Sequence, residues 1–398
     1  MEVIIGSYEE FIFGYKVKEK NGKLQFVLSF TNHSHCGSIR SIAATKTFLA
    51  SGSTDESIHL FNLEKRSEFG SLMEHNGTVN CLCFHGNHMV SGGEDGTICV
   101  WNTKQWTLEA KLLPSHKDGV ISFSIHPSGK LGLSVGKDMT MRTWNLIRGR
   151  SAYITNIKAV ADHVTWSPDG EHYALVINKK VDIYTVSTAK VVYSIQWPVS
   201  VTSVAFIDEA VVAVGGEKKS IEIHSLTTKT CICSFEAHER RVKALKYAAP
   251  QWLFSASSDG FIKLWHLEAY QTGRKPGLLA QVNTTCRITC MTVRETGDVT
   301  ELENLKACLT PATKCEPANE HDVKLSHEDM TPRKKLHSSR RESWEEGTEV
   351  SPRNSLNVTN GEHRSRKRKK SVRLLTPSQK RMLTLRGSSS RRKKKDMQ

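Results

Sequence analysis

The sequence predicts an all-β protein, a seven-bladed β-propeller followed by a basic tail without regular structure. Two observations support the propeller: a β-hairpin pattern recurs along residues 1–293, and its copies lie 40 to 46 residues apart. Four-stranded blades repeat with such a period, so seven copies indicate seven blades. A third observation supports the tail, because hydrophobic periodicity stops at Arg294 and Lys and Arg accumulate toward the end of the 398-residue chain.

The repeated unit is a strand of small residues, a tight turn at Asp-Gly or a variant of it, and an alternating strand that ends in an aromatic residue. This is the pattern of a β-hairpin. The strong copies are residues 51–61, 91–101, 134–144 and 255–265, and weaker ones are 6–15, 178–184 and 218–224. The turns then fall at Glu9, Asp55, Asp95, Asp138, Asn178, Lys218 and Asp259.

The two ends of the repeat region predict how the ring closes. The first turn, at Glu9, comes so early that the first blade lacks an innermost strand, whereas residues 287–293 form one alternating strand with no hairpin after it. We therefore expect 287–293 to complete the blade formed by residues 3–30, which removes an open sheet edge. The propeller should span residues 1–293.

A histidine precedes each strong turn by 20 to 22 residues. In a WD-repeat blade this histidine, a strand serine, the turn aspartate and the closing aromatic form a buried network whose polar atoms have partners. A hydrolase triad or a metal site would use similar residues, but an active site is not repeated in every blade. The expected network residues are His35, Ser51, Asp55, Phe61, His75, Ser91, Asp95, Trp101, His116, Ser134, Asp138, Trp144, His238, Ser255, Asp259 and Trp265.

Composition narrows the class of protein further. No stretch approaches the roughly 20 apolar residues of a membrane span, and the first residues lack the features of a signal peptide. We therefore expect an intracellular, soluble protein. The ten cysteines include two C-x-C pairs, Cys81 with Cys83 and Cys231 with Cys233, but no C-x-x-C pair. Reduced, buried thiols are expected rather than disulfides or a zinc site.

The chain after the propeller divides by charge. Residues 294–330 hold four Lys and Arg against nine Asp and Glu, which predicts a disordered acidic linker, while residues 331–398 hold 21 against six. Dense basic runs favour nuclear or nucleolar targeting and contact with the RNA backbone, although a merely solubilising tail is the alternative. The residues of these runs are Arg364, Arg366, Lys367, Arg368, Lys369, Lys370, Arg391, Arg392, Lys393, Lys394 and Lys395.

Two weak copies are candidate partner-binding surfaces. The blades with turns at Asn178 and Lys218 lack the network residues, so their loops are free to vary; simple drift explains them equally well. Their exposed lysines face either acidic partners or water, and water is favoured. These lysines are Lys179, Lys180, Lys218 and Lys219.

Once the copies are aligned, the propeller resembles the PAK-interacting protein family from end to end. The resemblance rests on residues 124–136, 142–146, 149–152, 255–263 and 6–10. The tail agrees in its basic character and in the final Met397-Gln398, but hardly in detailed sequence.

The resemblance implies two activities. Members of this family act in the nucleolus in maturation of the large ribosomal subunit, and the vertebrate form binds the regulatory region of a PAK-family serine/threonine kinase and restrains its activation. The implied partners are that kinase, pre-ribosomal assembly factors and, through the tail, ribosomal RNA, with the protein a monomer within larger complexes. The alternative is a general nuclear adaptor with an RNA-binding tail and no kinase role.

An enzyme is the third class of function, and the sequence disfavours it. No phosphate-binding loop, nucleophile elbow or set of metal ligands stands out, so neither catalytic residues nor a cofactor is expected.

Overall fold

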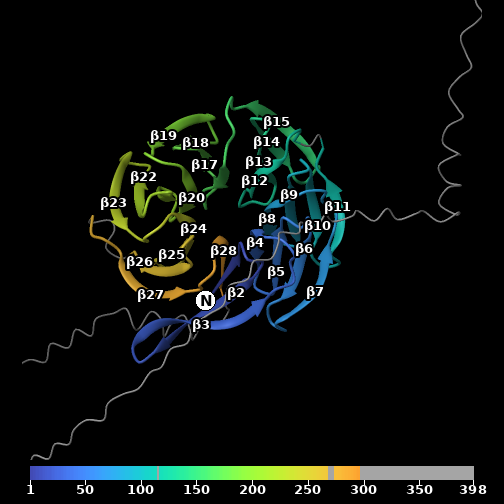
Figure 1. The fold of residues 1–398 in the computed structure, drawn as a ribbon. Helices are drawn as coiled ribbons and strands as arrows, with labels where there is room; N and C mark the ends of the chain where they lie inside the picture. Colours follow the sequence, from blue (N-terminus) through green and yellow to red (C-terminus); the bar gives the residue numbers. More distant parts are fainter. Residues whose placement is uncertain (114–115, 268–272, 296–398) are drawn as a thin grey trace, which may run out of the picture. The chain divides into compact units, whose positions relative to one another are not determined.

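The computed structural model describes residues 1–113, 116–267 and 273–295, which form 28 β-strands. These strands build seven four-stranded antiparallel sheets that surround a central channel as the blades of a propeller (Figure 1). The predicted seven-bladed all-β fold is confirmed. No helix in the described part of the chain has the length and apolar character to cross a membrane. Apart from residues 294 and 295, the expected acidic linker and basic tail lie outside the described residues.

Each blade is numbered from the N-terminus, and its strands run from the channel outward. Blade 1 contains β28 (Ile288–Arg294), β1 (Glu2–Ser7), β2 (Ile12–Lys20) and β3 (Lys23–Asn32). Blade 2 contains β4 (Ile39–Ala44), β5 (Phe48–Ser53), β6 (Ile58–Asn62) and β7 (Ser67–Leu72). Blade 3 contains β8 (Val79–His85), β9 (His88–Gly93), β10 (Ile98–Asn102) and β11 (Thr107–Lys111).

The remaining blades repeat this arrangement. Blade 4 contains β12 (Val120–Ile125), β13 (Leu131–Gly136), β14 (Thr140–Asn145) and β15 (Arg150–Asn156). Blade 5 contains β16 (His163–Trp166), β17 (His172–Ile177), β18 (Lys180–Thr185) and β19 (Lys190–Gln196). Blade 6 contains β20 (Val201–Phe206), β21 (Val211–Gly216), β22 (Ser220–Ser225) and β23 (Thr230–Glu236). Blade 7 contains β24 (Val242–Ala248), β25 (Trp252–Ser257), β26 (Phe261–His266) and β27 (Gly277–Asn283).

The second strand of each blade is the most deeply buried, because neighbouring blades cover both of its faces. All six residues of β21 and of β25 are buried, whereas the outer strand β7 is exposed over five of its six residues. Close packing between blades explains the small residues in these strands. A Cβ atom at Gly52 would lie 2.5 Å from Val79 Cγ1 of the next blade, and one at Gly92 would lie 2.8 Å from Val120 Cγ1.

Strands from the two ends of the propeller sequence close the ring. The strand expected over 287–293 is β28, which pairs antiparallel with β1 from Glu2 opposite Arg294 to Gly6 opposite Cys290. Glu2 is fully buried at this junction and binds two guanidinium groups, Arg66 at 2.6 Å and Arg294 at 2.9 Å. Because Arg66 belongs to blade 2, this carboxylate joins both ends of the propeller sequence to the neighbouring blade.

Candidate functional site in the blade networks and the channel mouth

Blade 4 carries a complete hydrogen-bonded network. The indole Nε1–H of Trp144 donates to Ser134 Oγ at 2.8 Å, and Ser134 Oγ lies 2.7 Å from His116 Nε2. His116 Nδ1 lies 2.9 Å from Asp138 Oδ1. The donors run in one direction if the imidazole is neutral, since the serine hydroxyl then donates to Nε2 and Nδ1–H donates to the carboxylate.

The ionisation states of His116 and Asp138 agree with this order of donors and acceptors. Burial lowers the pKa of His116, and the hydrogen bond and charge of Asp138 offset that effect only in part. Burial by itself would raise the pKa of Asp138, but hydrogen bonds from His116 and Thr140 lower it to about 2. At neutral pH the network therefore pairs a neutral histidine with a charged aspartate.

Blade 3 repeats the network with the same partners. Trp101 Nε1 donates to Ser91 Oγ at 2.8 Å, and this hydroxyl lies 2.8 Å from His75 Nε2. His75 Nδ1 lies 3.2 Å from Asp95 Oδ2, which also accepts a hydrogen bond from the backbone N–H of Asn76. The aspartate thus fastens the loop between blades to the hairpin turn, as its counterpart does in blade 4.

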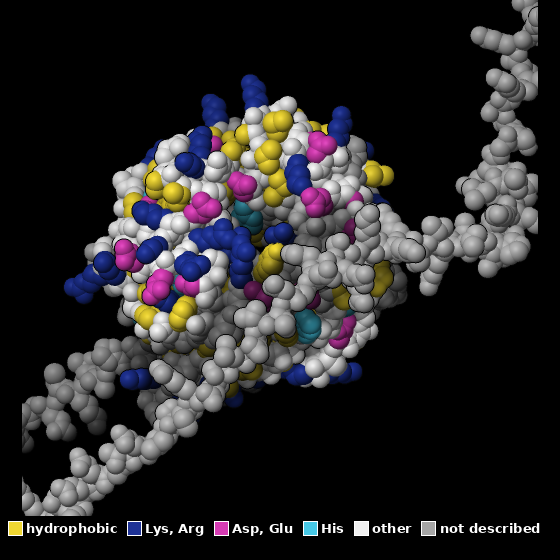
Figure 2. Space-filling model, viewed as in Figure 1, with side chains coloured by type: hydrophobic (Ala, Val, Ile, Leu, Met, Phe, Trp, Pro, Cys, Tyr) yellow, Lys and Arg dark blue, Asp and Glu magenta, His cyan; other side chains and the backbone are white. Residues whose placement is uncertain are grey.

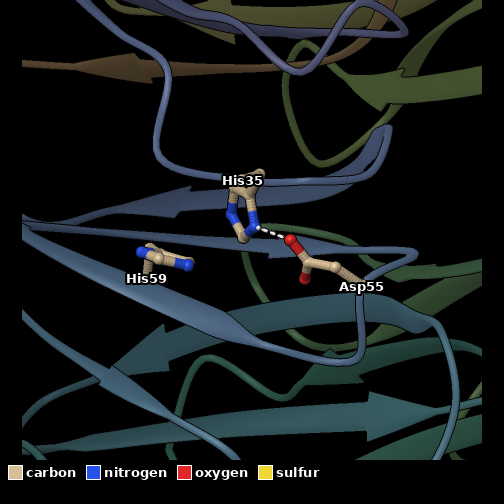
Figure 3. A group of neighbouring side chains, drawn as sticks. All are labelled: His35, Asp55 and His59. Carbon is tan, nitrogen blue, oxygen red and sulfur yellow. Dashed lines mark hydrogen bonds and ion pairs between the residues drawn. The ribbon is translucent and has the colours of Figure 1, made fainter.

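Blade 2 departs from the expected network at its aromatic residue. His35 lies 2.8 Å from both Ser51 Oγ and Asp55 Oδ2, but Phe61 has no hydrogen-bond donor and packs in the apolar core instead. His59 lies beside His35, and the centres of the two rings are 4.3 Å apart in an edge contact (Figure 3). The expected participation of Phe61 in hydrogen bonding is wrong, because a phenyl ring offers only apolar contacts.

Blade 7 departs from the network at its aspartate. Trp265 and Ser255 are joined at 2.9 Å, and Ser255 Oγ lies 2.7 Å from His238 Nε2. His238 Nδ1, however, has no hydrogen-bond partner among the described residues. Asp259 accepts a hydrogen bond from the backbone N–H of Phe261 at 3.0 Å. It therefore stabilises the turn and does not bind the histidine. Asp138 and Asp259 occupy equivalent positions in the sequence repeat, but only Asp138 is hydrogen-bonded to the histidine of its blade.

Acid should destabilise the protein through its buried histidines. Burial lowers the pKa of His238 to about 4, and the charge of Lys263 adds to this shift. Between the unfolded value of about 6.5 and 4, the unfolded chain binds the proton more strongly, so stability falls as pH falls through this range. We expect the urea midpoint of His238→Gln to fall less between pH 7 and pH 4.5 than that of the exposed control His33→Gln. Equal losses in the two variants would contradict this assignment.

Among the described residues, two groups of side chains have ligand atoms close enough for one metal ion. They are His35 with Asp55 and His59, and Glu222 with His224 and Cys231. In the first group both nitrogens of His35 are already bonded, so an ion would have to displace Ser51 or Asp55. The first group is therefore satisfied as part of the blade network.

Two of the four lysines of the weak blades contact other side chains of this chain. Lys180 Nζ lies 2.8 Å from Asp182. Lys218 Nζ lies 3.0 Å from Glu222 and 5.4 Å from the centre of the Trp197 ring. Lys179 and Lys219 are exposed. These contacts weaken the interpretation of the four lysines as one surface for acidic partners.

The eight described cysteines are all free thiols. Burial raises the pKa of Cys83 and of Cys290 to about 11, so neither is a thiolate at neutral pH. Cys36 and Cys231 are exposed, against the expectation that the thiols are buried.

A group of positive charges in the described part of the chain lies at one mouth of the channel, and sequence reasoning missed it. We name the five cations there the basic sector. Figure 2 shows Lys and Arg side chains gathered at the channel mouth, on the side of β24 and β28. A spacing signal exists, since Arg241 and Arg287 each directly precede an inner strand. The basic sector consists of Arg40, Arg240, Arg241, Lys243 and Arg287.

The predicted targeting and RNA-contact residues, at positions 364–370 and 391–395, lie outside the described residues. They remain a prediction.

The fold and the blade networks define the class: this is a WD-repeat β-propeller. The family model "WD domain, G-beta repeat" matches residues 24–62, 66–102, 107–145 and 229–266, and the gap before the last match covers the weak copies at 178–184 and 218–224. The chain is 45% identical over 305 residues to "p21-activated protein kinase-interacting protein 1-like" from Danio rerio, which covers 76% of this chain and 82% of that protein. It belongs to the p21-activated protein kinase-interacting protein 1 family.

A second relative agrees with this assignment, and a solved structure agrees with the fold. The human p21-activated protein kinase-interacting protein 1 is 37% identical over 334 residues, with 82% of this chain and 84% of that protein covered. A chain in a crystal structure of the mitotic checkpoint complex superposes with a TM-score of 0.57 at 18% identity, over 67% of this chain and 87% of the other. At that identity the likeness concerns the fold alone.

Proposed function

We propose that this protein is a non-catalytic scaffold that binds the regulatory region of a PAK-family kinase and restrains its activation, and that it also acts in nucleolar assembly of the large ribosomal subunit. One observation carries the kinase role. Relatives that share 37% and 45% of their aligned residues with this chain, over more than four fifths of their own length, are named as proteins that interact with p21-activated protein kinase.

The geometry supports a scaffold rather than an enzyme. The histidine, serine and aspartate side chains that resemble a triad are bonded to one another inside blades, and His35, His75 and His116 are buried. A nucleophile needs an activated, accessible oxygen beside its base. In blades 3 and 4 the serine hydroxyl instead accepts a hydrogen bond from an indole.

Kinase binding should depend on the propeller and not on the charge of the tail. The test compares the full chain with a variant in which the Lys and Arg residues of 364–370 and 391–395 are replaced by glutamine. Both proteins should co-precipitate with the purified kinase and slow its activation to the same extent. If only the protein with the unaltered tail bound the kinase, attraction between opposite charges would explain the binding better than recognition by the propeller.

The nucleolar role is supported by the charge of the tail. Residues 331–398 carry 21 Lys and Arg against six Asp and Glu, the composition of a segment that contacts polyanions. Tagged protein in a nuclear extract should sediment with precursors of the large subunit at low salt, and the glutamine variant should leave those fractions. Absence of the unaltered protein from them would reject the role.

These two experiments also separate the alternative function. A general nuclear adaptor would enter the nucleus and bind RNA through its tail, yet neither bind the kinase nor change its activation.

A further inference from the structure

We propose that the basic sector is a docking surface for an acidic peptide segment of a partner protein, one that presents Asp, Glu or phosphorylated side chains to the channel mouth. This deepens the proposed scaffold function by naming the chemistry of a partner segment. It requires only that the propeller binds proteins, and it does not depend on the identity of the kinase.

The five cations converge from three consecutive blades. Arg240 and Arg241 precede β24 of blade 7, on which Lys243 lies, Arg287 precedes β28 of blade 1, and Arg40 lies on β4 of blade 2. Burial lowers the pKa of Lys243, and the charges of Arg241, Arg40 and Arg287 lower it further. Arg40 and Lys243 line one cavity and Arg241 and Arg287 line another, so an anion at the channel mouth would be attracted by all four charges.

Few of these charges are neutralised by the chain itself. Arg40, Arg240 and Arg287 are exposed, and no described carboxylate lies within ion-pair distance of their side chains. Arg241 reaches Glu217 only at 4.0 Å. Glu9 accepts a hydrogen bond from the backbone N–H of Arg287, which leaves the guanidinium of that residue available. The guanidinium groups can therefore bind carboxylate or phosphate oxygens in pairs.

The surface is hollowed where a side chain would enter. A depression of about 520 Å³ is lined by Glu217, Arg240, Arg241, Ser258 and Arg287. A second cavity of about 330 Å³ lies in the channel and reaches Arg40 and Lys243. The guanidinium of Arg287 lies 5.2 Å from the centre of the half-exposed Tyr8 ring, so an aromatic face borders the depression.

The charge distribution favours a short peptide over a nucleic acid strand. Away from the basic sector the channel is lined by uncharged Asn80 and Thr202, by the exposed cation of Lys246 and by the exposed carboxylate of Asp162, while Asp118 is exposed in the loop before β12. A phosphate backbone laid across the mouth would meet these carboxylates. An acidic segment that enters over blades 7, 1 and 2 meets the five cations of the basic sector against the lining carboxylate of Glu217, with the polar walls of the channel beside it.

The experiment maps where an acidic probe binds, because the basic tail of the full chain will also attract it. The probe is a synthetic twelve-residue peptide of alternating Glu and Gly with one photo-crosslinking residue, and cross-linked segments are identified by mass spectrometry. We expect cross-links around residues 240–246 and 287–294. In the double variant Arg241→Ser, Arg287→Ser their yield should fall by at least about tenfold, since the loss of one charged contact by itself weakens binding by about that factor. Cross-links to the tail should be unchanged.

A matched control keeps the test specific. Arg148→Ser with Arg150→Ser removes two exposed arginines from blade 4 and should leave the cross-links at the mouth intact. Equal urea midpoints for both double variants would show that the fold is preserved. Cross-links confined to the tail, or a mouth signal that the Arg241 and Arg287 substitutions do not change, would overturn the proposal. Stronger cross-linking at the mouth by an oligouridylate of equal charge would overturn it in favour of RNA. None of these outcomes bears on kinase binding, which the co-precipitation tests separately.

Discussion

Replacing Glu2 by glutamine should lower the free energy of unfolding by about 3–5 kcal/mol, the usual cost of breaking a buried ion pair from one side. Glu2 is fully buried and its carboxylate binds Arg66 and Arg294. Its loss leaves two guanidinium groups without their anion at the seam where β28 meets β1. Urea denaturation of the full chain, followed by circular dichroism, measures the effect.

The pH dependence of this effect has a definite sign. Burial by itself would raise the pKa of Glu2, but hydrogen bonds from Arg66, Ser29 and Arg294 lower it below the ordinary value of 4.5. The ion pairs therefore stabilise the fold above about pH 4.5, and this contribution is lost as pH falls through the lower folded value. The difference between wild type and Glu2→Gln should shrink in acid. Glu19→Gln, at an exposed position on β2, is the matched control and should change stability by less than about 0.5 kcal/mol.

The second large effect is a contrast between two aspartates that the sequence cannot tell apart. Asp138→Ala should lower the free energy of unfolding by about 3–5 kcal/mol, because it removes the carboxylate that both the buried Nδ1–H of His116 and the guanidinium of Arg142, 3.5 Å away, contact. Asp259→Ala should cost only about 1 kcal/mol, since its described role is to accept the backbone N–H of Phe261 in the turn.

Measuring both variants by urea denaturation under the same conditions makes the contrast independent of the absolute scale. Similar losses for Asp138→Ala and Asp259→Ala would mean that His238 is held by its aspartate after all. A third variant, Trp144→Phe, gives a reference, because it reproduces in blade 4 the aromatic residue that blade 2 has at Phe61. The free energy of unfolding of Trp144→Phe should be lower than that of the wild type by about 1–3 kcal/mol, because the buried hydroxyl of Ser134 loses the indole donor.

Much of the fold could be predicted because each blade is formed largely by residues that are close together in the sequence. The hairpin turns at Asp55, Asp95 and Asp138 depend on residues a few positions apart, and the period of the copies counts the blades. The strand that follows Arg287 was recognisable because it alternates and has no hairpin partner downstream. Local patterns of this kind need no knowledge of the tertiary structure.

The candidate site was less predictable. The basic sector joins Arg40 to Lys243 and Arg287, residues that are far apart in the sequence and meet only because the ring closes. Lys180 and Lys218 looked free in the sequence, yet each is within 3.0 Å of a carboxylate. Counting charged residues along the sequence therefore does not predict which charges lie close together in the folded protein.

The sequence by itself determined the all-β class, the number of blades, the residues able to form the networks and the separation of a basic tail, because these follow from short-range patterns and composition. The tertiary structure alone decided which networks are complete, with His116 bonded to Asp138 and His238 not bonded to Asp259. It also placed the charge of Glu2 at the ring seam and the five cations at one mouth. Hydrogen bonds and electrostatic attraction act over a few ångströms in space, and only ring closure sets which distant residues come within that range.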